Sequence, residues 1–239
     1  MIKEAMRYFL DQSKPELVEV DGKTYSNKSL CRVVQTPRAD SIKMSTLSSL
    51  VEYIKSGIDT MKGKMLVQVV SPTKVVLFSQ LDDDRERETV VTVVAQLPDF
   101  EFERFMDKEK FNIAMQSKFI DNEDKALMLQ FTGTVESGTI AQYSDDGVSQ
   151  KATIKTGIAS KGEALVPNPV HLKPYRTFIE VDQPESDFIF RMKEDKYDDG
   201  ITCAIFEADG GAWQLEAMAN IKKYLIEELK DCGDYTVIS

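Results

Sequence analysis

The order of apolar and polar positions divides the chain into stretches with helical spacing and stretches with strand spacing. At the N-terminus, Ile2, Met6, Phe9 and Leu10 recur on one side of a helix, which predicts an amphipathic helix over residues 1–11. Charged residues interrupt this stretch, whereas a signal peptide has a continuous apolar region. We therefore expect no export and a cytoplasmic location.

A second helix is predicted within residues 41–61. Its apolar positions recur at intervals of three and four: Leu47, Leu50, Val51 and Ile54. Ser45 or Thr46 is the expected N-cap, because a side-chain oxygen there accepts a free backbone N–H group of the first turn. Gly57 is the expected stop.

Short β-rich runs joined by turn residues predict antiparallel pairs. Residues 17–20 and 23–26 flank Asp21-Gly22, a dipeptide that favours a tight hairpin turn. Three further runs, rich in valine and leucine, are expected to form one antiparallel meander: residues 64–70, 74–79 and 89–96.

The second half of the chain has the same mixture. Helices are predicted over residues 103–119 and 122–131, and a hairpin is predicted around Asp145-Asp146-Gly147, between strands at 138–144 and 150–156. The remaining strand candidates are residues 170–179, 187–193, 201–207 and 235–238.

The clearest helical pattern lies in residues 212–231. Its apolar seam consists of Met218, Ile221, Leu225 and Leu229. Asp209 precedes this helix as a candidate cap, and Gly233 is the expected end.

Strands and helices follow one another without regular β–α–β alternation. The pattern therefore predicts an α+β fold, with antiparallel sheets, helices on one face and a long C-terminal helix. A change of periodicity near residues 133–138 favours two domains, an N-terminal α+β domain at 1–135 and a C-terminal β-rich domain with the closing helix at 136–239. A single domain with one continuous sheet is the alternative.

Charge and composition restrict the classes of partner. The net charge of −10 argues against an extensive duplex nucleic-acid interface, which needs a basic stripe. No apolar run approaches the roughly 20 residues that cross a membrane, so we expect no membrane partner. Three cysteines, an odd number, fit a reducing cytoplasm better than a disulfide framework. Residues 151–176 carry five bases against one acid, a local excess that suits a small anion.

An aromatic and cationic group within and after this basic stretch is the strongest candidate for a ligand site. Arginine binds phosphate in a bidentate manner, and tyrosine or tryptophan stacks on a base. The candidate ligand-binding residues are Lys173, Tyr175, Arg176, Arg191 and Trp213. The alternative is packing on a strand surface, with Arg176 in an ion pair with Glu180 or Asp182.

A metal-dependent nuclease is the competing hypothesis. It rests on Glu180 and Asp182, two carboxylates close in sequence, with Lys193 beyond them, because phosphodiester cleavage by metal ions needs clustered acids. The Asp209-Gly210-Gly211 turn before the long helix is either a phosphate site or a tight strand-to-helix turn.

Other reactive residues have simpler explanations. His171 is the only histidine, which excludes a site with several histidines, and no nucleophile elbow accompanies it. Cys31 has Arg32 beside it but no identified base. The charged run from Asp82 to Glu88 is typical of a solvated loop rather than of a divalent-metal site. We assign no catalytic residue, no metal and no cofactor.

Residues 167–192, PNPVHLKPYRTFIEVDQPESDFIFRM, form a proline-rich segment, and FEADGGAWQLEAMANIKKYL follows at 206–225. Together they resemble the C-terminal part of the YfdQ-like phage and prophage proteins. The matching residues are Pro167, Pro169, Leu172, Pro174, Tyr175, Arg176, Phe178, Gln183, Pro184, Ser186, Phe188, Arg191, Asp209, Gly210, Gly211 and Trp213. The resemblance implies a phage-encoded protein of the host cytoplasm and carries no established reaction.

These observations favour a non-enzymatic binding protein that counteracts host immunity. Its expected partner is a small nucleotide-type anion or a host protein. The nuclease, as an accessory protein of phage DNA metabolism, is the alternative, and an assembly protein without a small ligand is a third reading. We also expect a homo-oligomer, because hairpin-rich sheets leave strand edges that need cover.

Overall fold

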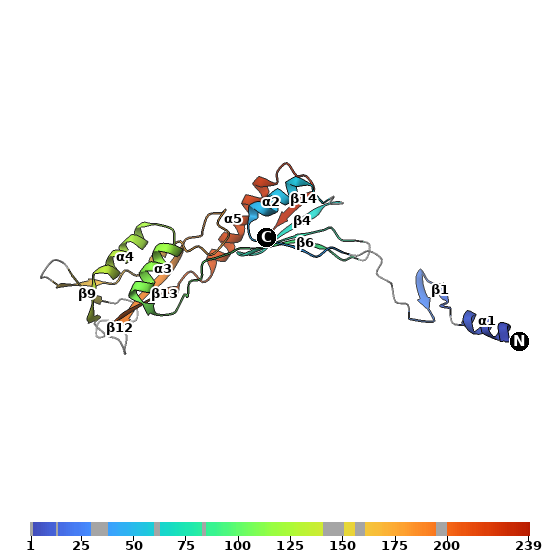
Figure 1. The fold of residues 1–239 in the computed structure, drawn as a ribbon, viewed down its shortest axis with the longest axis horizontal. Helices are drawn as coiled ribbons and strands as arrows, with labels where there is room; N and C mark the ends of the chain where they lie inside the picture. Colours follow the sequence, from blue (N-terminus) through green and yellow to red (C-terminus); the bar gives the residue numbers. More distant parts are fainter. Residues whose placement is uncertain are drawn as a thin grey trace. The chain divides into compact units, whose positions relative to one another are not determined.

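The computed structural model divides the chain into two units, Met1–Ala39 and Asp40–Ser239. It describes residues 2–12, 14–29, 38–59, 63–82, 85–140, 151–155, 161–194 and 200–239 (Figure 1). The fold is α+β, as predicted, with mostly antiparallel sheets. The boundary that the sequence favours, between residues 135 and 136, lies inside the second unit. No helix of the described residues is long and apolar enough to cross a membrane.

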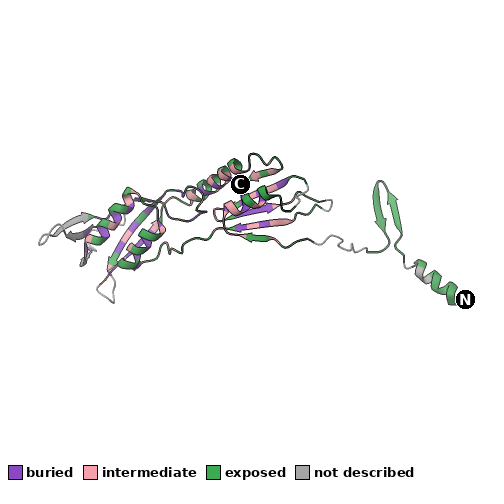
Figure 2. Cartoon of the chain, turned by 45° about the horizontal axis from the view of Figure 1, so that its top comes forward, coloured by how far each residue is buried: buried purple, intermediate pink, exposed green. Residues whose placement is uncertain are grey.

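The described residues of the N-terminal unit form one helix and one hairpin. Helix α1 spans Ile2–Gln12, and strands β1, Leu17–Val20, and β2, Lys23–Ser26, pair antiparallel. The turn residues Asp21 and Gly22 have φ values of 52° and 70°, which is the left-handed region that this tight hairpin turn requires. Helix and hairpin are confirmed where the sequence predicts them. Their described side chains are exposed (Figure 2).

A five-stranded sheet forms one layer of the second unit. Its order is β14-β4-β5-β6-β3, and β4, β5 and β6 form the predicted antiparallel meander. The outer strands β14 and β3 each run parallel to their neighbour. The strand bounds are β3 Ile42–Met44, β4 Met65–Ser71, β5 Lys74–Phe78, β6 Thr89–Val94 and β14 Tyr235–Ile238.

Two helices pack on one face of this sheet. Helix α2 spans Leu47–Ser56, with Thr46 as N-cap and Gly57, at φ 59°, as C-cap, as the sequence predicts. Helix α5 spans Ala212–Glu228. With the sheet they enclose the α2–α5 cluster of buried side chains: Leu47, Leu50, Val51, Ile54, Met65, Val67, Val69, Val75, Leu77, Val91, Val93, Phe178, Val181, Ile221, Leu225 and Leu229.

The second unit also contains an antiparallel four-stranded sheet of order β11-β12-β13-β7, which is covered by its own pair of helices. Its strands are β7 Met106–Asp107, β11 Val170–Leu172, β12 Ser186–Glu194 and β13 Ile201–Glu207. Helices α3, Lys108–Lys118, and α4, Glu123–Thr134, pack on it, and Phe111 of α3 stacks on Phe190 of β12. We name the enclosed side chains the α3–α4 cluster; it includes Phe111, Met115, Met128, Leu172, Phe188, Phe190, Met192 and Ile205.

A three-stranded antiparallel sheet of order β10-β9-β8 adjoins this part. Its strands are β8 Val135–Ile140, β9 Lys151–Lys155 and β10 Lys161–Leu165, and Val135 and Ala152 reach the α3–α4 cluster. The sequence predicts the pairing of β8 with β9 but does not single out β10. The predicted turn at residues 145–147 lies outside the described residues.

Several predicted boundaries are wrong. Helix α3 starts at Lys108, not at residue 103, because Glu103 has a φ of 61° and Asp107 caps the helix by accepting the N–H groups of Glu109 and Lys110. The strand predicted over residues 170–179 ends at Leu172, and the chain then turns.

The two ends of α5 also differ from the prediction. Gly211 is the N-cap residue and has no capping side chain, while Asp209 accepts the Gly211 N–H at 2.9 Å. The helix ends at Glu228, five residues before Gly233, although its predicted seam is confirmed: Ile221, Leu225 and Leu229 are buried and Met218 packs beside them.

Candidate functional site

Arg176 occupies the centre of the predicted ligand group, and it is 6% exposed. Its guanidinium donates to the Glu207 carboxylate at 2.8 Å and to the Ser186 hydroxyl. A second carboxylate, that of Asp209, lies 4.0 Å away. The ion pair with Glu180 or Asp182 is therefore a wrong prediction. The carboxylates beside Arg176 come instead from the end of β13 and the residues after it, a segment that the sequence did not connect with Arg176.

Trp213 covers this guanidinium. The central guanidinium carbon lies 4.0 Å from the centre of the Trp213 ring and 5.7 Å from the centre of the Phe188 ring, which are both cation–π distances. The turn of Asp209, Gly210 and Gly211 connects β13 to α5 and places Trp213 in the first turn of that helix, half-buried. The structure therefore brings together Arg176 and Trp213, two members of the predicted ligand group.

The electrostatics of this group are those of an internal ion-pair network in which two buried atoms, Arg176 Nε and Trp213 Nε1, have no hydrogen-bond partner. Burial would raise the pKa of Asp209, but hydrogen bonds from Ser186 and the amides of Gly211 and Trp213, and the charge of Arg176, hold that pKa below its usual 3.8. The Ser186 hydroxyl donates to Asp209 at 2.5 Å. One guanidinium thus faces two carboxylates, those of Glu207 and Asp209. An added phosphate would meet net negative charge there.

The remaining predicted ligand residues, Lys173, Tyr175 and Arg191, lie at two different places. The backbones of Lys173 and Tyr175 bond to the end of α3: the Lys173 carbonyl accepts from Ile120 and the Tyr175 N–H donates to Lys118, at 2.9 and 3.0 Å. Arg191 lies on β12, where buried and exposed residues alternate. Because successive side chains of a strand point to opposite faces, Arg191 points away from the Phe188 face.

Gln183 is a structural residue that the sequence reasoning missed. Its buried side-chain oxygen accepts the N–H groups of Arg176 and Thr177 at 3.0 and 3.2 Å. Its amide nitrogen donates to the carbonyls of Phe178 and Val181 at 2.9 and 3.2 Å. The backbone turns at residues 176–181, where these N–H and carbonyl groups have no neighbouring strand to bond. The single Gln183 amide supplies their hydrogen bonds instead. A glutamine before a proline carries no pattern that would have revealed this role.

The residues of the nuclease hypothesis are engaged at separate places. The Glu180 carboxylate accepts the N–H of Ser48 at 3.3 Å, in the first turn of α2, where the helix dipole favours a negative charge. The Asp182 carbonyl accepts from Asn220 of α5. Lys193 lies 3.9 Å from the centre of the Phe105 ring. Among the described residues, no group of three or more His, Cys, Asp and Glu side chains is placed to hold a metal ion.

His171 forms an exposed pair with Asp187, its register partner across β11 and β12. The His171 Nδ1 lies 2.6 Å from the Asp187 carboxylate, and this hydrogen bond raises the pKa of His171 above its usual 6.5. Cys203 is buried, and burial raises the pKa of its thiol to about 12. Cys31 lies outside the described residues.

The proline-rich segment (residues 167–192) belongs to both hydrophobic clusters. Leu172 and Phe188 pack in the α3–α4 cluster, whereas Phe178 and Val181 pack in the α2–α5 cluster. Thr177 also donates to the Pro72 carbonyl, in the turn between β4 and β5, at 2.5 Å. The residues that carry the family resemblance therefore connect the two clusters.

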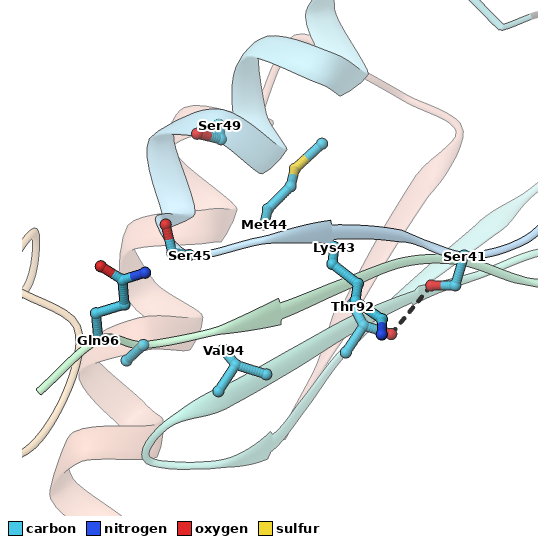
Figure 3. A pocket seen from close by; sticks show the side chains of 9 residues that line it. Ser41, Lys43, Met44, Ser45, Ser49, Thr92, Val94 and Gln96 are labelled. Carbon is cyan, nitrogen blue, oxygen red and sulfur yellow. Dashed lines mark hydrogen bonds between the residues drawn. The ribbon is translucent and has the colours of Figure 1, made fainter.

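An open cavity of about 830 Å³ lies at the opposite edge of the five-stranded sheet from β14 (Figure 3). It is bordered by β3, β6 and the start of α2. Met44, Val94 and Ala95 supply apolar surface, while serine and threonine hydroxyls and Lys43 lie around them. No residue of this cavity was predicted as a site, because each is an ordinary strand or cap residue.

No protein-family model matches this chain, and no curated protein and no solved structure matches it either.

Proposed function

We propose that this protein is a non-enzymatic binding protein whose target is another protein. The observation that carries the proposal is the exposure of apolar side chains in the N-terminal unit. Exposed fractions there reach 80% for Ile2, 65% for Met6, 54% for Val18, 51% for Val20 and 55% for Tyr25.

The described elements of the N-terminal unit, one short helix and one hairpin, are too small to be stable without a partner. Isolated helices shorter than about 12–15 residues are marginal in water, and α1 has 11. An isolated two-stranded hairpin is equally marginal. Because the described apolar side chains of helix and hairpin are exposed, these side chains are not buried between the two elements. A protein surface supplies the apolar contact that would stabilise both.

A nucleotide-type ligand is less well supported than a protein. Arg176 is the strongest predicted phosphate ligand, and its guanidinium contacts Glu207 and Ser186 and lies under Trp213. A phosphate there would lie close to the carboxylates of Glu207 and Asp209. The nuclease alternative has no observation in its favour, since Glu180 and Lys193 are engaged at separate places.

The resemblance to YfdQ-like phage proteins gives the proposal its biological setting. A phage-encoded protein of the host cytoplasm that has no reaction of its own acts by occupying other molecules. Counteracting host immunity by binding a host protein is the role that fits this setting.

The test follows Met6 by NMR in protein labelled with ¹³C at the methionine methyl groups. Met6 is 65% exposed and Met128, in the α3–α4 cluster, is fully buried, so Met128 is the internal control. We expect the Met6 signal to shift or broaden when bacterial lysate is added or when the protein is concentrated, while the Met128 signal stays unchanged. A Met6 signal that stays sharp under both conditions would contradict the proposal. Saturable binding of a cyclic dinucleotide or ADP-ribose in calorimetry, weakened by Arg176→Lys, would contradict it as well.

A further inference from the structure

We propose that the cavity beside β3 and β6 binds a small amphiphilic anion, a molecule with a carboxylate or phosphate group on an apolar body. The site lies within the second unit, goes beyond the protein target proposed above and does not depend on it. Three features of the five-stranded sheet support the site: its charge, two lysines without partners, and the mixed walls of the cavity.

The charged residues of the five-stranded sheet are all basic. Its strands contain two lysines, Lys43 on β3 and Lys74 on β5, and no aspartate or glutamate. The whole chain, by contrast, has 40 acids against 30 bases. The cavity lining likewise includes Lys43 and no acid, because Glu180, which accepts the Ser48 N–H, does not line it. A small anion meets a favourable local charge here, whereas a long polyanion would also meet the acidic remainder of the chain.

The two lysines lie on the face of the sheet opposite the helices. Lys43 is the register partner of Thr92, and Lys74 is the register partner of Val94. Val93, between these two residues of β6, is buried in the α2–α5 cluster, so Thr92 and Val94 point to the other face. Both lysines are exposed, and neither side chain forms a hydrogen bond or ion pair within the described part of the chain. Their ammonium groups, on the two sides of β6, are free to bind an anion.

The cavity adds hydroxyl groups and apolar surface to this charge. The hydroxyls of Ser41 and Thr92 share one hydrogen bond of 3.1 Å, so one of the two O–H groups stays available to a ligand (Figure 3). Val94 is 49% exposed, and Met44 supplies further apolar surface at the end of β3. The volume of about 830 Å³ is that of a small-molecule site. A head group beside Lys43 thus has apolar wall within reach of the rest of the ligand.

Binding is tested with hexanoate and hexyl phosphate as probes, by NMR of protein labelled with ¹³C at the methionine methyl groups. Met44 lines the cavity, and Met128, fully buried in the α3–α4 cluster, is the internal control. We expect the Met44 signal to shift saturably with the anions and not with hexylammonium, while the Met128 signal stays unchanged. A response to only one of the two anions supports the site and identifies its head group. A response to neither anion, or an equal response to hexylammonium, would overturn the proposal.

Three lysine variants test the charges. Lys43→Gln and Lys74→Gln should each weaken binding by roughly three- to tenfold, because each removes a charge-assisted contact at an exposed position. Lys43→Arg should retain most of the affinity. Lys64→Gln, at an exposed lysine just before β4, removes the same charge elsewhere and should bind as the parent does. An equal loss in all three glutamine variants would show that net charge alone attracts the probe, which would overturn the site.

The length of the probe tests the apolar wall. Affinity should rise from butyrate through hexanoate to octanoate by roughly twofold for each added CH₂, less than the roughly fourfold of complete burial, because the cavity is open. An affinity that does not change with length would show that the protein holds only the charge, and the proposal of an amphiphilic ligand would fall. None of these results alters the expected response of Met6, so the proposed protein target is tested separately.

Discussion

The guanidinium carbon of Arg176, which precedes β12 in the chain, lies 4.0 Å from the centre of the indole ring of Trp213, which follows β13. The contact forms because β13 returns antiparallel beside β12, and the Gly210-Gly211 turn then starts α5 over the loop that holds Arg176. Glu207 and Asp209, on the path between them, neutralise the cation. Arg176 is therefore a cross-link between three segments of the chain.

Replacing Arg176 by alanine should destabilise the protein. The variant leaves Glu207 and Asp209 without their cation and removes the surface on which Trp213 packs. Loss of one member of a buried ion pair costs 3–5 kcal/mol, and since Glu207 is about one-third exposed we expect about 2–3 kcal/mol. Urea unfolding measures this change. Arg104→Ala, which removes an exposed arginine from a surface ion pair with Glu101, is the control and should cost less than about 1 kcal/mol. Equal stability of both variants would show that the buried network contributes nothing.

Gln183→Leu should also lower the free energy of unfolding. Leucine keeps the volume but leaves the N–H groups of Arg176 and Thr177 and the carbonyl of Phe178 without their partner. Each buried polar group that loses its hydrogen bond costs about 1–3 kcal/mol. Guanidinium unfolding is the measurement, and Gln214→Leu, on exposed helix surface, is the control. Parent-like stability of Gln183→Leu would mean that water replaces the amide without loss.

Lys125→Met should destabilise the packing of α3 on α4. The buried ammonium of Lys125 donates to the Phe119 carbonyl at 2.8 Å and to the Asp121 carboxylate at 2.7 Å, and so caps the end of α3 from the first turn of α4. Methionine fills the space but cannot donate, so we expect a loss of about 1–3 kcal/mol in thermal unfolding. Lys110→Met, on the exposed side of α3, should change stability little. A similar loss in both variants would point to surface charge as the cause.

His171 should titrate above its usual pKa of 6.5, because the Asp187 carboxylate accepts its hydrogen bond and Asp124 and Glu185 add negative charge. It is the only histidine, so its ring signals in NMR give the pKa directly. The raised pKa means that the pair stabilises the fold fully below pH 6.5 and that this stabilisation is lost as pH rises through the folded-state pKa. Asp187→Asn should lower the pKa of His171 and remove this pH dependence. An unchanged pKa in the variant would show that the contact is absent in solution.

Local patterns predicted the local elements of the fold. The Asp21-Gly22 turn, the caps Thr46 and Gly57 and the seam of α5 depend on neighbours within a few residues, and all are confirmed. The pairing of β14 with β4 depends on residues that are far apart in the sequence and have no shared pattern. Short strands such as β3 and β7 carry too few residues to show a period.

The candidate site was predictable only in part, for the same reason. Arg176 and Trp213 were predicted as members of one candidate ligand group, and the structure brings these two side chains into contact. The carboxylates that pair with Arg176 were assigned to Glu180 and Asp182, because these are its neighbours in sequence. Antiparallel pairing of β12 with β13 brings Glu207 opposite Phe188 instead, and no periodicity in the sequence specifies that register.

The placement of the proline-rich segment in both clusters has a consequence for unfolding. Only a few residues separate Leu172, in the α3–α4 cluster, from Phe178, in the α2–α5 cluster, and Gln183 fixes the turn that follows. Neither cluster can be lost without withdrawing this segment from the other, so the two are expected to melt in a single cooperative transition. Trp213, the only tryptophan, sits at this junction, so its fluorescence reports the loss of either cluster. We therefore expect that the second unit, Asp40–Ser239, cannot be divided between its two clusters into independently folding pieces.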